Sequence, residues 1–244
     1  MKIEPLIWHQ DKALLVAFSA RQSALYPDDT IPGINVGLNT AEDQKRVWQK
    51  RARFLEKLEV PLSSVVFARQ IHSANILYVT DPGTVDGADG YVTDQPGLAL
   101  AIQVADCAAV FIADRSRGII GAAHAGWKGA AANILINTVS IMQSKGAKPE
   151  NMHAWISPCI GTSRFEVGEE VAEMFPSEFV LREGFEKPHI DLKGFVRSQL
   201  LQCGLPGDRI YTDPACTYDD SERFYSYRRD RDRAGRMMGL IVMR

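Results

Sequence analysis

The chain has 244 residues, which suits one large domain or two small ones, and either can bury a sizeable core. Hydrophobic residues make up 45% and charged residues 24% of the sequence, which excludes intrinsic disorder, collagen-like repeats and coiled coils. The formal net charge is −2, without the basic excess typical of proteins that bind nucleic-acid phosphates, so we expect no nucleic-acid partner.

Nothing in the sequence indicates export or membrane insertion. No apolar run approaches the roughly 18 residues that a membrane-spanning helix needs. The apolar stretch at residues 13–18 is short, and Glu4 and Asp11 precede it, which argues against a signal peptide. Four cysteines without a CxxC pair predict reduced thiols, so we expect a cytoplasmic protein. No repeat or Pro/Gly/Ser linker divides the chain, which predicts a single domain over residues 1–244.

The first half of the chain alternates apolar runs with turn residues. A strand is predicted at residues 14–18. A helix follows, with Thr40 as its N-cap and with Pro61 closing the segment. A dense β region comes next, interrupted by a turn at residues 81–83. Its strands are expected at residues 65–71, 76–80, 98–104, 108–113 and 119–123.

The second half mixes helices and strands. A helix is predicted over residues 130–145, and Gly146 is well placed to end it. Further helices are expected at residues 167–174 and 192–203, and further strands at residues 152–156, 209–211, 224–227 and 237–243. Strands outnumber helices without regular alternation, which favours an α+β fold with mixed β-sheets over a doubly wound nucleotide-binding fold.

Two histidines and a cysteine stand out by their position. His72 and His124 each lie at the end of a predicted strand, and Cys107 lies in a break between two β runs. Their separations match no zinc-finger spacing, so spacing alone does not identify a metal site. Taken singly, each also suits a structural role, as a hydrogen-bonded histidine or an inert buried thiol. The residues by themselves leave open a Cys/His metal site and a Cys–His nucleophile.

Other residues near these three also have two interpretations. Asp106 either bonds a turn amide or takes part in chemistry, and Gly126 either permits a tight turn or opens a helix whose amides receive an anion. Arg228 and Arg229 follow the predicted aromatic strand, where they can bind phosphate or carboxylate in a bidentate manner. The alternative for this arginine-rich stretch is a solvated hairpin tip with screened ion pairs.

Several short motifs occur together in a specific order. They are Gln70 to His72, Ala105 to Cys107, His124 to Gly129, Ile160 with Gly161, Phe165 to Gly168, Cys216 with Thr217, and Ser226 to Asp230. In this order they resemble the laccase-domain family, which is variously labelled polyphenol oxidase, purine nucleoside phosphorylase and peptidoglycan editing factor. The resemblance extends from about Phe18 to the C-terminus and implies a mixed β-sandwich flanked by helices.

The chain departs from the family pattern at a few positions. Ser73 replaces a glycine, Ala109 a proline and Ser157 a glycine. The N-terminal Arg-x-Gly-Gly loop reads Arg-Gln-Ser-Ala at residues 21–24 and lacks both glycines, whereas Arg21, Asn35 and Gly37 match. These changes retain the expected metal ligands, and we expect them to affect the loops around the substrate.

The resemblance implies an enzyme with a zinc site formed by His72, Cys107 and His124, in which three protein ligands leave a fourth position open. It implies phosphorolysis of adenosine, inosine and methylthioadenosine to the free base and ribose 1-phosphate, together with adenosine deamination at C6. Cys107, Asp106 and His124 are then catalytic, with Asp106 in proton transfer. The expected substrate- or anion-binding residues are Arg228, Arg229, Arg21 and the amides near Gly126.

Three alternatives remain at this point. Five histidines without a His-x-His pair cannot supply a multicopper cluster, although a single copper ion can occupy the zinc ligands. A Cys–His hydrolase that edits peptidoglycan precursors would use Cys107 as nucleophile and His124 or His72 as base. A non-catalytic binding protein would need no such grouping. The sequence gives no prediction of oligomeric state.

Overall fold

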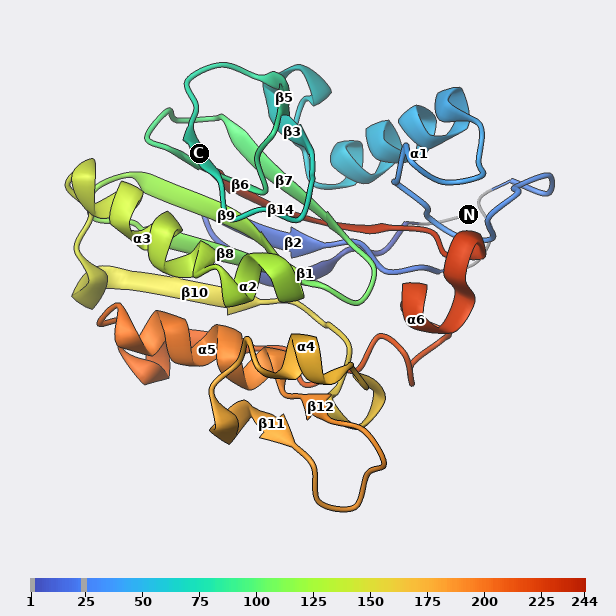
Figure 1. The fold of residues 1–244 in the computed structure, drawn as a ribbon. Coiled ribbons are helices and arrows are strands. Elements are labelled where there is room, and N and C mark those ends of the chain that lie inside the picture. The colour runs from blue at the N-terminus through green and yellow to red at the C-terminus, as the bar shows by residue number, and fades with distance from the viewer. Residues whose placement is uncertain (1–2, 23–25) are drawn as a thin grey trace.

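The protein is a sandwich of two six-stranded β-sheets with helices on both outer faces (Figure 1). The computed structural model describes residues 3–22 and 26–244. The first sheet has the order β1-β2-β14-β7-β3-β5 and the second β13-β10-β8-β9-β6-β4, and each contains parallel and antiparallel pairs. The predicted α+β fold with mixed, packed sheets is therefore confirmed.

The elements have the following bounds. The first sheet contains β1 (Leu6–Gln10), β2 (Leu14–Phe18), β3 (Val65–Arg69), β5 (Gly83–Asp86), β7 (Ala99–Val104) and β14 (Met237–Met243). The second contains β4 (Ile76–Tyr78), β6 (Gly90–Thr93), β8 (Ala108–Asp114), β9 (Ile119–Ala125), β10 (Met152–Ile156) and β13 (Ile210–Thr212). The helices are α1 (Gln44–Lys57), α2 (Trp127–Ala131), α3 (Ile134–Ser144), α4 (Glu169–Ala172), α5 (Leu192–Gln202) and α6 (Tyr227–Asp230), and β11 (Val180–Leu181) pairs with β12 (His189–Ile190).

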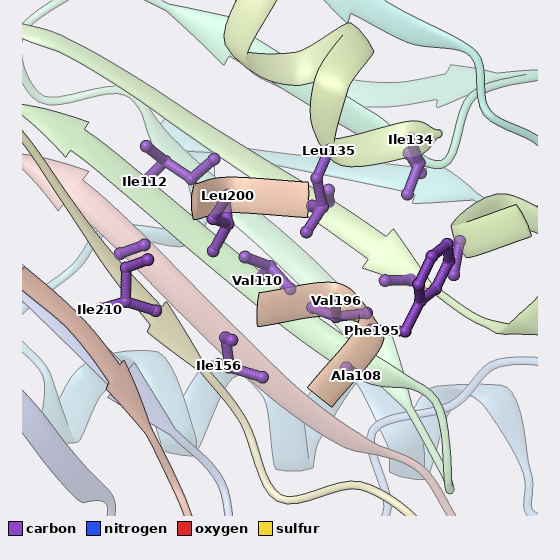
Figure 2. Packing of buried hydrophobic residues seen from close by; sticks show 14 of the residues in the cluster. Ala108, Val110, Ile112, Ile134, Leu135, Ile156, Phe195, Val196, Leu200 and Ile210 are labelled. Carbon is purple, nitrogen blue, oxygen red and sulfur yellow. The ribbon is translucent and has the colours of Figure 1, made fainter. Parts of the chain in front are cut away.

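Alternating side chains on β8 show how the layers are held. Phe111 faces the other sheet, whereas Val110 and Ile112 face the helices. Leu135 of α3 and Leu200 of α5 belong to the same buried cluster as these two residues (Figure 2). The central strands are thus buried on both faces, which explains why their sequences are continuous apolar runs.

Helix α1 covers the outer face of the first sheet. Asp43 caps it by accepting a hydrogen bond from the Arg46 amide, so the predicted Thr40 cap is wrong. The Thr40 hydroxyl is occupied elsewhere, since it donates to the Gly37 carbonyl and accepts from the side chain of Asn35. The helix therefore begins at Gln44, a few residues later than predicted.

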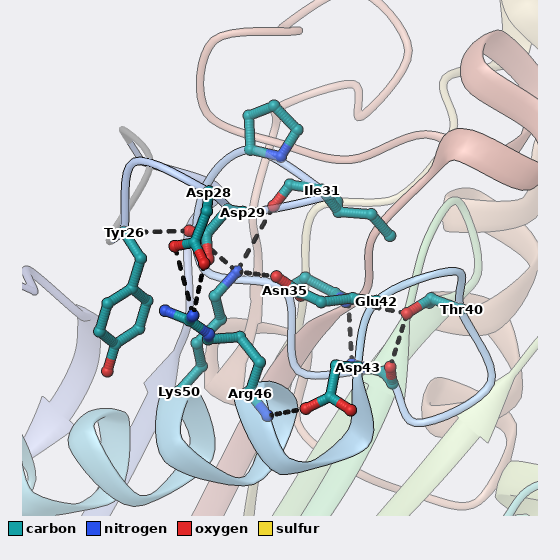
Figure 3. A network of polar contacts seen from close by, with 12 residues as sticks. Tyr26, Asp28, Asp29, Ile31, Asn35, Thr40, Glu42, Asp43, Arg46 and Lys50 are labelled. Carbon is teal, nitrogen blue, oxygen red and sulfur yellow. Dashed lines mark hydrogen bonds and ion pairs between the residues drawn. The ribbon is translucent and has the colours of Figure 1, made fainter.

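A buried charge network joins α1 to the preceding loop (Figure 3). Lys50 contacts Asp29 at 3.1 Å and Glu42 at 2.5 Å, and all three side chains are almost fully buried. The Asn35 side chain donates to Glu42 at 2.8 Å. Because buried charges are tolerated only when paired, this network fixes the loop at residues 35–37 against the helix.

Three predicted elements are corrected. The helix expected at residues 130–145 is two helices, α2 and α3, because Asn133 has a φ of 63° and breaks the continuous spiral. The expected helix at 167–174 is helical only in α4. The strand expected at 224–227 does not form: the buried Tyr225 directs its amide to Met237 Sδ and its hydroxyl to the Pro32 carbonyl.

The sequence prediction also missed strands β1, β5, β6, β11 and β12. The other predicted elements are confirmed with shifts of a few residues at their ends. All four cysteines are free, as expected. Within residues 3–22 and 26–244, no helix is both long and apolar enough to cross a membrane.

Candidate metal centre and active-site cavity

His72, Cys107 and His124 meet at one point. Each offers one ligand atom, and these atoms all lie within 4.8 Å of one another. The rings of His72 and His124 have centroids 4.8 Å apart and meet edge to face at 72°. His72 lies in the loop after β3, Cys107 lies between β7 and β8, and His124 is near the end of β9. The site therefore forms where the two sheets of the sandwich adjoin.

Unusual backbone conformations occur beside this point. His72 has a φ of 61° and Asp106 a φ of 81°, both in the left-handed region that non-glycine residues seldom adopt. Such conformations persist where surrounding contacts fix them, and they are common at functional sites. Here the contacts come from carboxylates.

Asp89 organises two of the three candidate ligands. This fully buried carboxylate accepts hydrogen bonds from the amides of Ile71, His72 and Ser73 at 3.2, 2.9 and 2.6 Å. It also contacts His124 Nδ1 at 2.8 Å and accepts from the Ser73 hydroxyl at 2.8 Å. The left-handed His72 backbone lets three successive amides point at one carboxylate. Asp89 thus positions the His72 loop and the His124 ring together.

Electrostatics favour the charged form of Asp89. Burial alone would raise its pKa, but the hydrogen bonds from His124 and Ser73 lower it to about 2. The sequence analysis missed this residue, because Asp89 lies between Ala88 and Gly90 in a segment without a recognisable motif. No pattern in the single sequence identifies it.

Cys107 and His124 form a mutually stabilised pair. Burial would raise the pKa of the Cys107 thiol, yet His124 and, less strongly, His72 lower it to about 6. Burial would lower the pKa of His124, but the Cys107 thiolate and Asp89 raise it. In the metal-free protein the thiol is therefore poised to ionise near neutral pH, and the thiolate is the form that binds metals and attacks electrophiles.

The donor set suits a single metal ion. Two imidazoles and a thiolate are common ligands of zinc and of copper. The Asp89 contact occupies His124 Nδ1, which leaves Nε2 for the ion, and such an outer hydrogen bond usually accompanies a metal-ligating histidine. Because the protein supplies three donors, a fourth position is left for a small ligand. These residues fit a mononuclear centre.

The centre opens into a cavity of about 1220 Å³. Aromatic side chains form much of its wall, from Trp48, Phe67, Trp127, Phe165 and Tyr227. Its cationic residues are Arg51, Arg69, Arg228, Arg231 and Arg236, against the acidic residues Asp106 and Glu166. The cavity is large enough for a drug-sized organic molecule, and its arginine excess favours an anionic group.

Of the three predicted arginines, Arg228 lines the cavity. Its guanidinium donates to the Glu166 carbonyl at 2.9 Å. Arg229 does not line it, since its guanidinium is directed to Asp230 and to backbone carbonyls, including that of Thr217 at 2.9 Å. Both arginines lie on α6 and not after a strand.

Arg21, the third predicted arginine, also lies away from the cavity. It donates to the Ser221 carbonyl at 2.8 Å, and its guanidinium lies 5.5 Å from the centroid of the Tyr225 ring. Arg21 and Arg229 therefore hold the C-terminal segment in place. Ser23 and Ala24, where the family has glycines, lie outside the described residues.

The Asp106 carboxylate contacts residues of two other motifs. One carboxylate oxygen accepts from the Thr217 hydroxyl at 2.7 Å and the other from the Arg228 amide at 2.6 Å. Thr217 and Arg228 belong to motifs far from Asp106 in sequence, so this carboxylate brings three segments to the edge of the cavity. Each oxygen retains a lone pair for a further partner.

Gly126 is required for space. A Cβ atom at this position would lie 2.9 Å from Cys107 Sγ and 3.3 Å from His72 Cδ2. The glycine is the N-cap of α2, which is only five residues long. The close approach of two candidate ligands explains why position 126 is a glycine, without any need for anion binding.

Two departures from the family pattern compensate each other. The Ala109 amide donates to the Ser157 hydroxyl at 2.9 Å, and both residues are fully buried. A proline at 109 would have no amide hydrogen, and a glycine at 157 would have no acceptor. Ser73 likewise adds its hydroxyl to the contacts of Asp89. The substituted residues therefore preserve the framework of the site.

Ser157→Ala is expected to lower the free energy of unfolding by about 1–3 kcal/mol, because the buried Ala109 amide loses its acceptor. The same substitution should cost less in a protein that already carries Ala109→Pro, because proline has no amide hydrogen. Urea unfolding of the wild type, the two single variants and the double variant measures this coupling. Strictly additive costs would contradict the proposed pairing.

Comparison with known proteins identifies the family of the chain. A family model described as multi-copper polyphenol oxidoreductase laccase matches residues 16–244. The purine nucleoside phosphorylase of Deinococcus radiodurans is 37% identical over 245 residues, covering 97% of this chain and 92% of its own. Adenosine deaminase RL5, from an unknown prokaryotic organism, is 28% identical and covers 94% of each chain.

The fold also matches that of solved structures. The crystal structure of YlmD from Geobacillus stearothermophilus superposes with a TM-score of 0.88 at 30% identity, covering 99% of this chain and all of that one. Sequence and fold thus match over nearly the full length, as the motifs predicted. The chain belongs to the laccase-domain family, whose model carries the description multi-copper polyphenol oxidoreductase laccase.

Proposed function

We propose that this protein is a zinc-dependent purine nucleoside phosphorylase that also deaminates adenosine. Its substrates would be adenosine, inosine and methylthioadenosine, with phosphate as the second substrate. The observation that carries the proposal is the group of His72, Cys107 and His124 at the wall of a cavity rich in arginine and aromatic residues. The names of the relatives support the same class of reaction. We place the activity in the cytoplasm, where reducing conditions keep Cys107 free.

The residues of the chain would divide the work of phosphorolysis. A phosphate oxygen bonds to C1′ of the ribose as the C1′–N9 bond breaks, and the electron pair leaves with the base, which then takes up a proton. The arginines, Arg228 among them, would hold the phosphate oxygens, and Asp106 would take part in the proton transfer. The aromatic walls would stack on the purine and exclude water.

Zinc, when bound by His72, Cys107 and His124, would supply Lewis acidity and a nucleophilic water for deamination. Asp89 would keep His124 in the tautomer that presents Nε2. Copper can bind the same donors. The remaining three histidines lie elsewhere: His9 and His153 lie beside Trp155, and His189 packs on Phe185. The donors brought together suit one ion and do not suggest a multicopper cluster.

A second function has one specific observation in its favour. The lowered pKa of Cys107 and the raised pKa of His124 are also the arrangement of a cysteine nucleophile with its base. Such a pair would act on an acyl group, as in the hydrolysis of a peptidoglycan precursor, without a metal. Metal dependence therefore separates the two candidates.

The test uses wild-type protein purified without added metal. We expect about one zinc per chain by elemental analysis, and release of ribose 1-phosphate from inosine that requires phosphate. Chelation should abolish the reaction, and zinc should restore it. Ribose formation in place of ribose 1-phosphate, or activity that survives complete metal removal, would contradict the proposal.

A further inference from the structure

We infer that Arg51 and Arg236 form the subsite for inorganic phosphate, an inference that rests on the proposed phosphorylase function. Neither residue was expected from the sequence to bind an anion. Both line the cavity that contains the candidate metal centre. Among residues 3–22 and 26–244, neither guanidinium forms an ion pair with a carboxylate.

Arg51 is a buried cation that lacks a counter-ion. It is 1% exposed, and its guanidinium lies 4.6 Å from the centroid of Trp48 and 4.7 Å from that of Phe67. Nε donates to the Val36 carbonyl and Nη2 to the Gln103 side chain, both at 2.8 Å. These are the hydrogen bonds of this guanidinium within the described chain, and they leave Nη1 for a ligand. Burying a charge without an opposite charge is costly, and an anion in the cavity would offset that cost.

Arg236 is held by the same loop that binds Arg51 and by two backbone carbonyls. Its amide donates to Asn35 Oδ1 at 2.9 Å, and its Nη1 donates to the carbonyls of Ala234 and Gly235. Gly37 makes room for it, since a Cβ there would lie 2.4 Å from Arg236 Cγ. Nε and Nη2 are not used by these contacts. Burial lowers the pKa of Arg236, whereas Cys107 and Asp106 oppose the shift. The Arg236 guanidinium is therefore close enough to the candidate metal centre to interact with its charged residues.

The loop at residues 35–37 fixes both arginines. Asn35 binds the backbone of Arg236, and Val36 binds the side chain of Arg51. Asn35 is itself held by Glu42, which pairs with the buried Lys50. The guanidinium groups are therefore placed before any ligand arrives, which lowers the entropic cost of binding. The buried charge network around Lys50 therefore positions the two arginines of the anion site.

The other cavity arginines are arranged differently. Arg228 is half-buried and donates Nη1 to the Glu166 carbonyl at 2.9 Å, so it can assist at the rim of the subsite. Arg69 is exposed and contacts Asp86 at 3.5 Å, and Arg231 is exposed on the surface. One buried and one half-buried guanidinium group with unused donors suit a tetrahedral dianion. Nε and Nη2 of Arg236 can form parallel hydrogen bonds to two phosphate oxygens, and Nη1 of Arg51 can donate to a third. Lysine offers a point charge without this fork.

The test titrates inorganic phosphate into the metal-loaded protein without nucleoside, at constant ionic strength. We expect Arg51→Lys and Arg236→Lys each to weaken phosphate binding about 10- to 100-fold, because the directional guanidinium donors to phosphate are lost. Arg53→Lys is the matched control, since Arg53 is exposed on the same helix. Thermal unfolding checks that each variant is folded. Unchanged phosphate affinity in both folded lysine variants would overturn the inference.

A second measurement needs no arginine variant. Because Trp48 stacks on Arg51, phosphate should change the tryptophan fluorescence of the wild type, and Trp48→Phe should remove that change. No fluorescence change on phosphate binding would overturn the inference. Adenosine 5′-monophosphate provides the comparison ligand: if it binds through these arginines while free phosphate does not, the subsite belongs to a nucleotide and the inference fails.

The inference and the proposed function can fail separately. Phosphate binding that is lost in both lysine variants, together with no ribose 1-phosphate from the wild type, supports the subsite and contradicts phosphorolysis. Ribose 1-phosphate formation with an unchanged KM for phosphate in both variants overturns the subsite and leaves phosphorolysis intact.

Discussion

When metal-free protein is treated with iodoacetamide at pH 7, alkylation of Cys107 is expected to abolish all of the activity that zinc would otherwise restore. Because the two histidines lower its pKa to about 6, this thiol is mostly ionised at that pH, and Cys107 lines the cavity. Cys159 should not react, because it is fully buried and burial raises its pKa to about 12. Burial also raises the pKa of Cys203. Peptide mass spectrometry identifies the modified residue.

The pH dependence has a definite sign. Alkylation of Cys107 should remain fast down to about pH 6 and fall below it, because protonation then removes the thiolate. Zinc added beforehand should protect Cys107. Cys107→Ala should lose both zinc and activity, whereas Cys203→Ala, the matched control on the far end of α5, should keep both. Alkylation that is equally fast with bound zinc would rule out Cys107 as a metal ligand.

Asp89→Asn should have the next largest effect, with metal affinity and kcat/KM reduced about 10- to 100-fold. The asparagine amide would place a donor where the amides of residues 71–73 and His124 Nδ1 also donate. We also expect a loss of about 1–3 kcal/mol in the free energy of unfolding, because buried donors lose their acceptor. Competition with a chromophoric chelator measures the metal affinity.

The control for this variant is Asp94→Asn, whose carboxylate accepts from the Tyr78 hydroxyl away from the cavity. It should retain metal affinity. Because the pKa of Asp89 is lowered, its contribution to stability is complete above the ordinary aspartate pKa and disappears as the pH falls through about 2. An Asp89→Asn protein with unchanged metal affinity would show that Asp89 has only a structural role.

The local patterns predicted much of the framework. Apolar runs located β2, β7, β8, β9 and β14, and the three candidate ligands were recognised because His72, Cys107 and His124 lie within specific motifs. β5 and β6 were missed because each has only four residues and because the segment at residues 83–90 is rich in glycine and aspartate, which usually indicate turns. Phe224 and Tyr225 resembled a strand because burial, and not pairing, selects their aromatic side chains.

The polar part of the site depends on contacts between distant residues, which a single sequence does not reveal. Lys50 and Arg51 are charged, so a hydrophobic pattern assigns them to the solvent side of α1, although both are buried. Their burial is possible only because the loop at residues 26–42 supplies Asp29, Glu42 and the Val36 carbonyl. Asp89 is similar, since its partners come from the loop after β3 and from strand β9.

Strand β14 lies in the middle of the first sheet, between β2 and β7, although it is far from both in the sequence. During translation, β2 and β7 therefore acquire their common neighbour only after β14 has been synthesised. Such long-range pairing is slow and exposes unpaired strand edges in the meantime. Nascent chains should therefore depend on chaperones until β14 has emerged, and a variant that lacks β14 should not accumulate as folded protein.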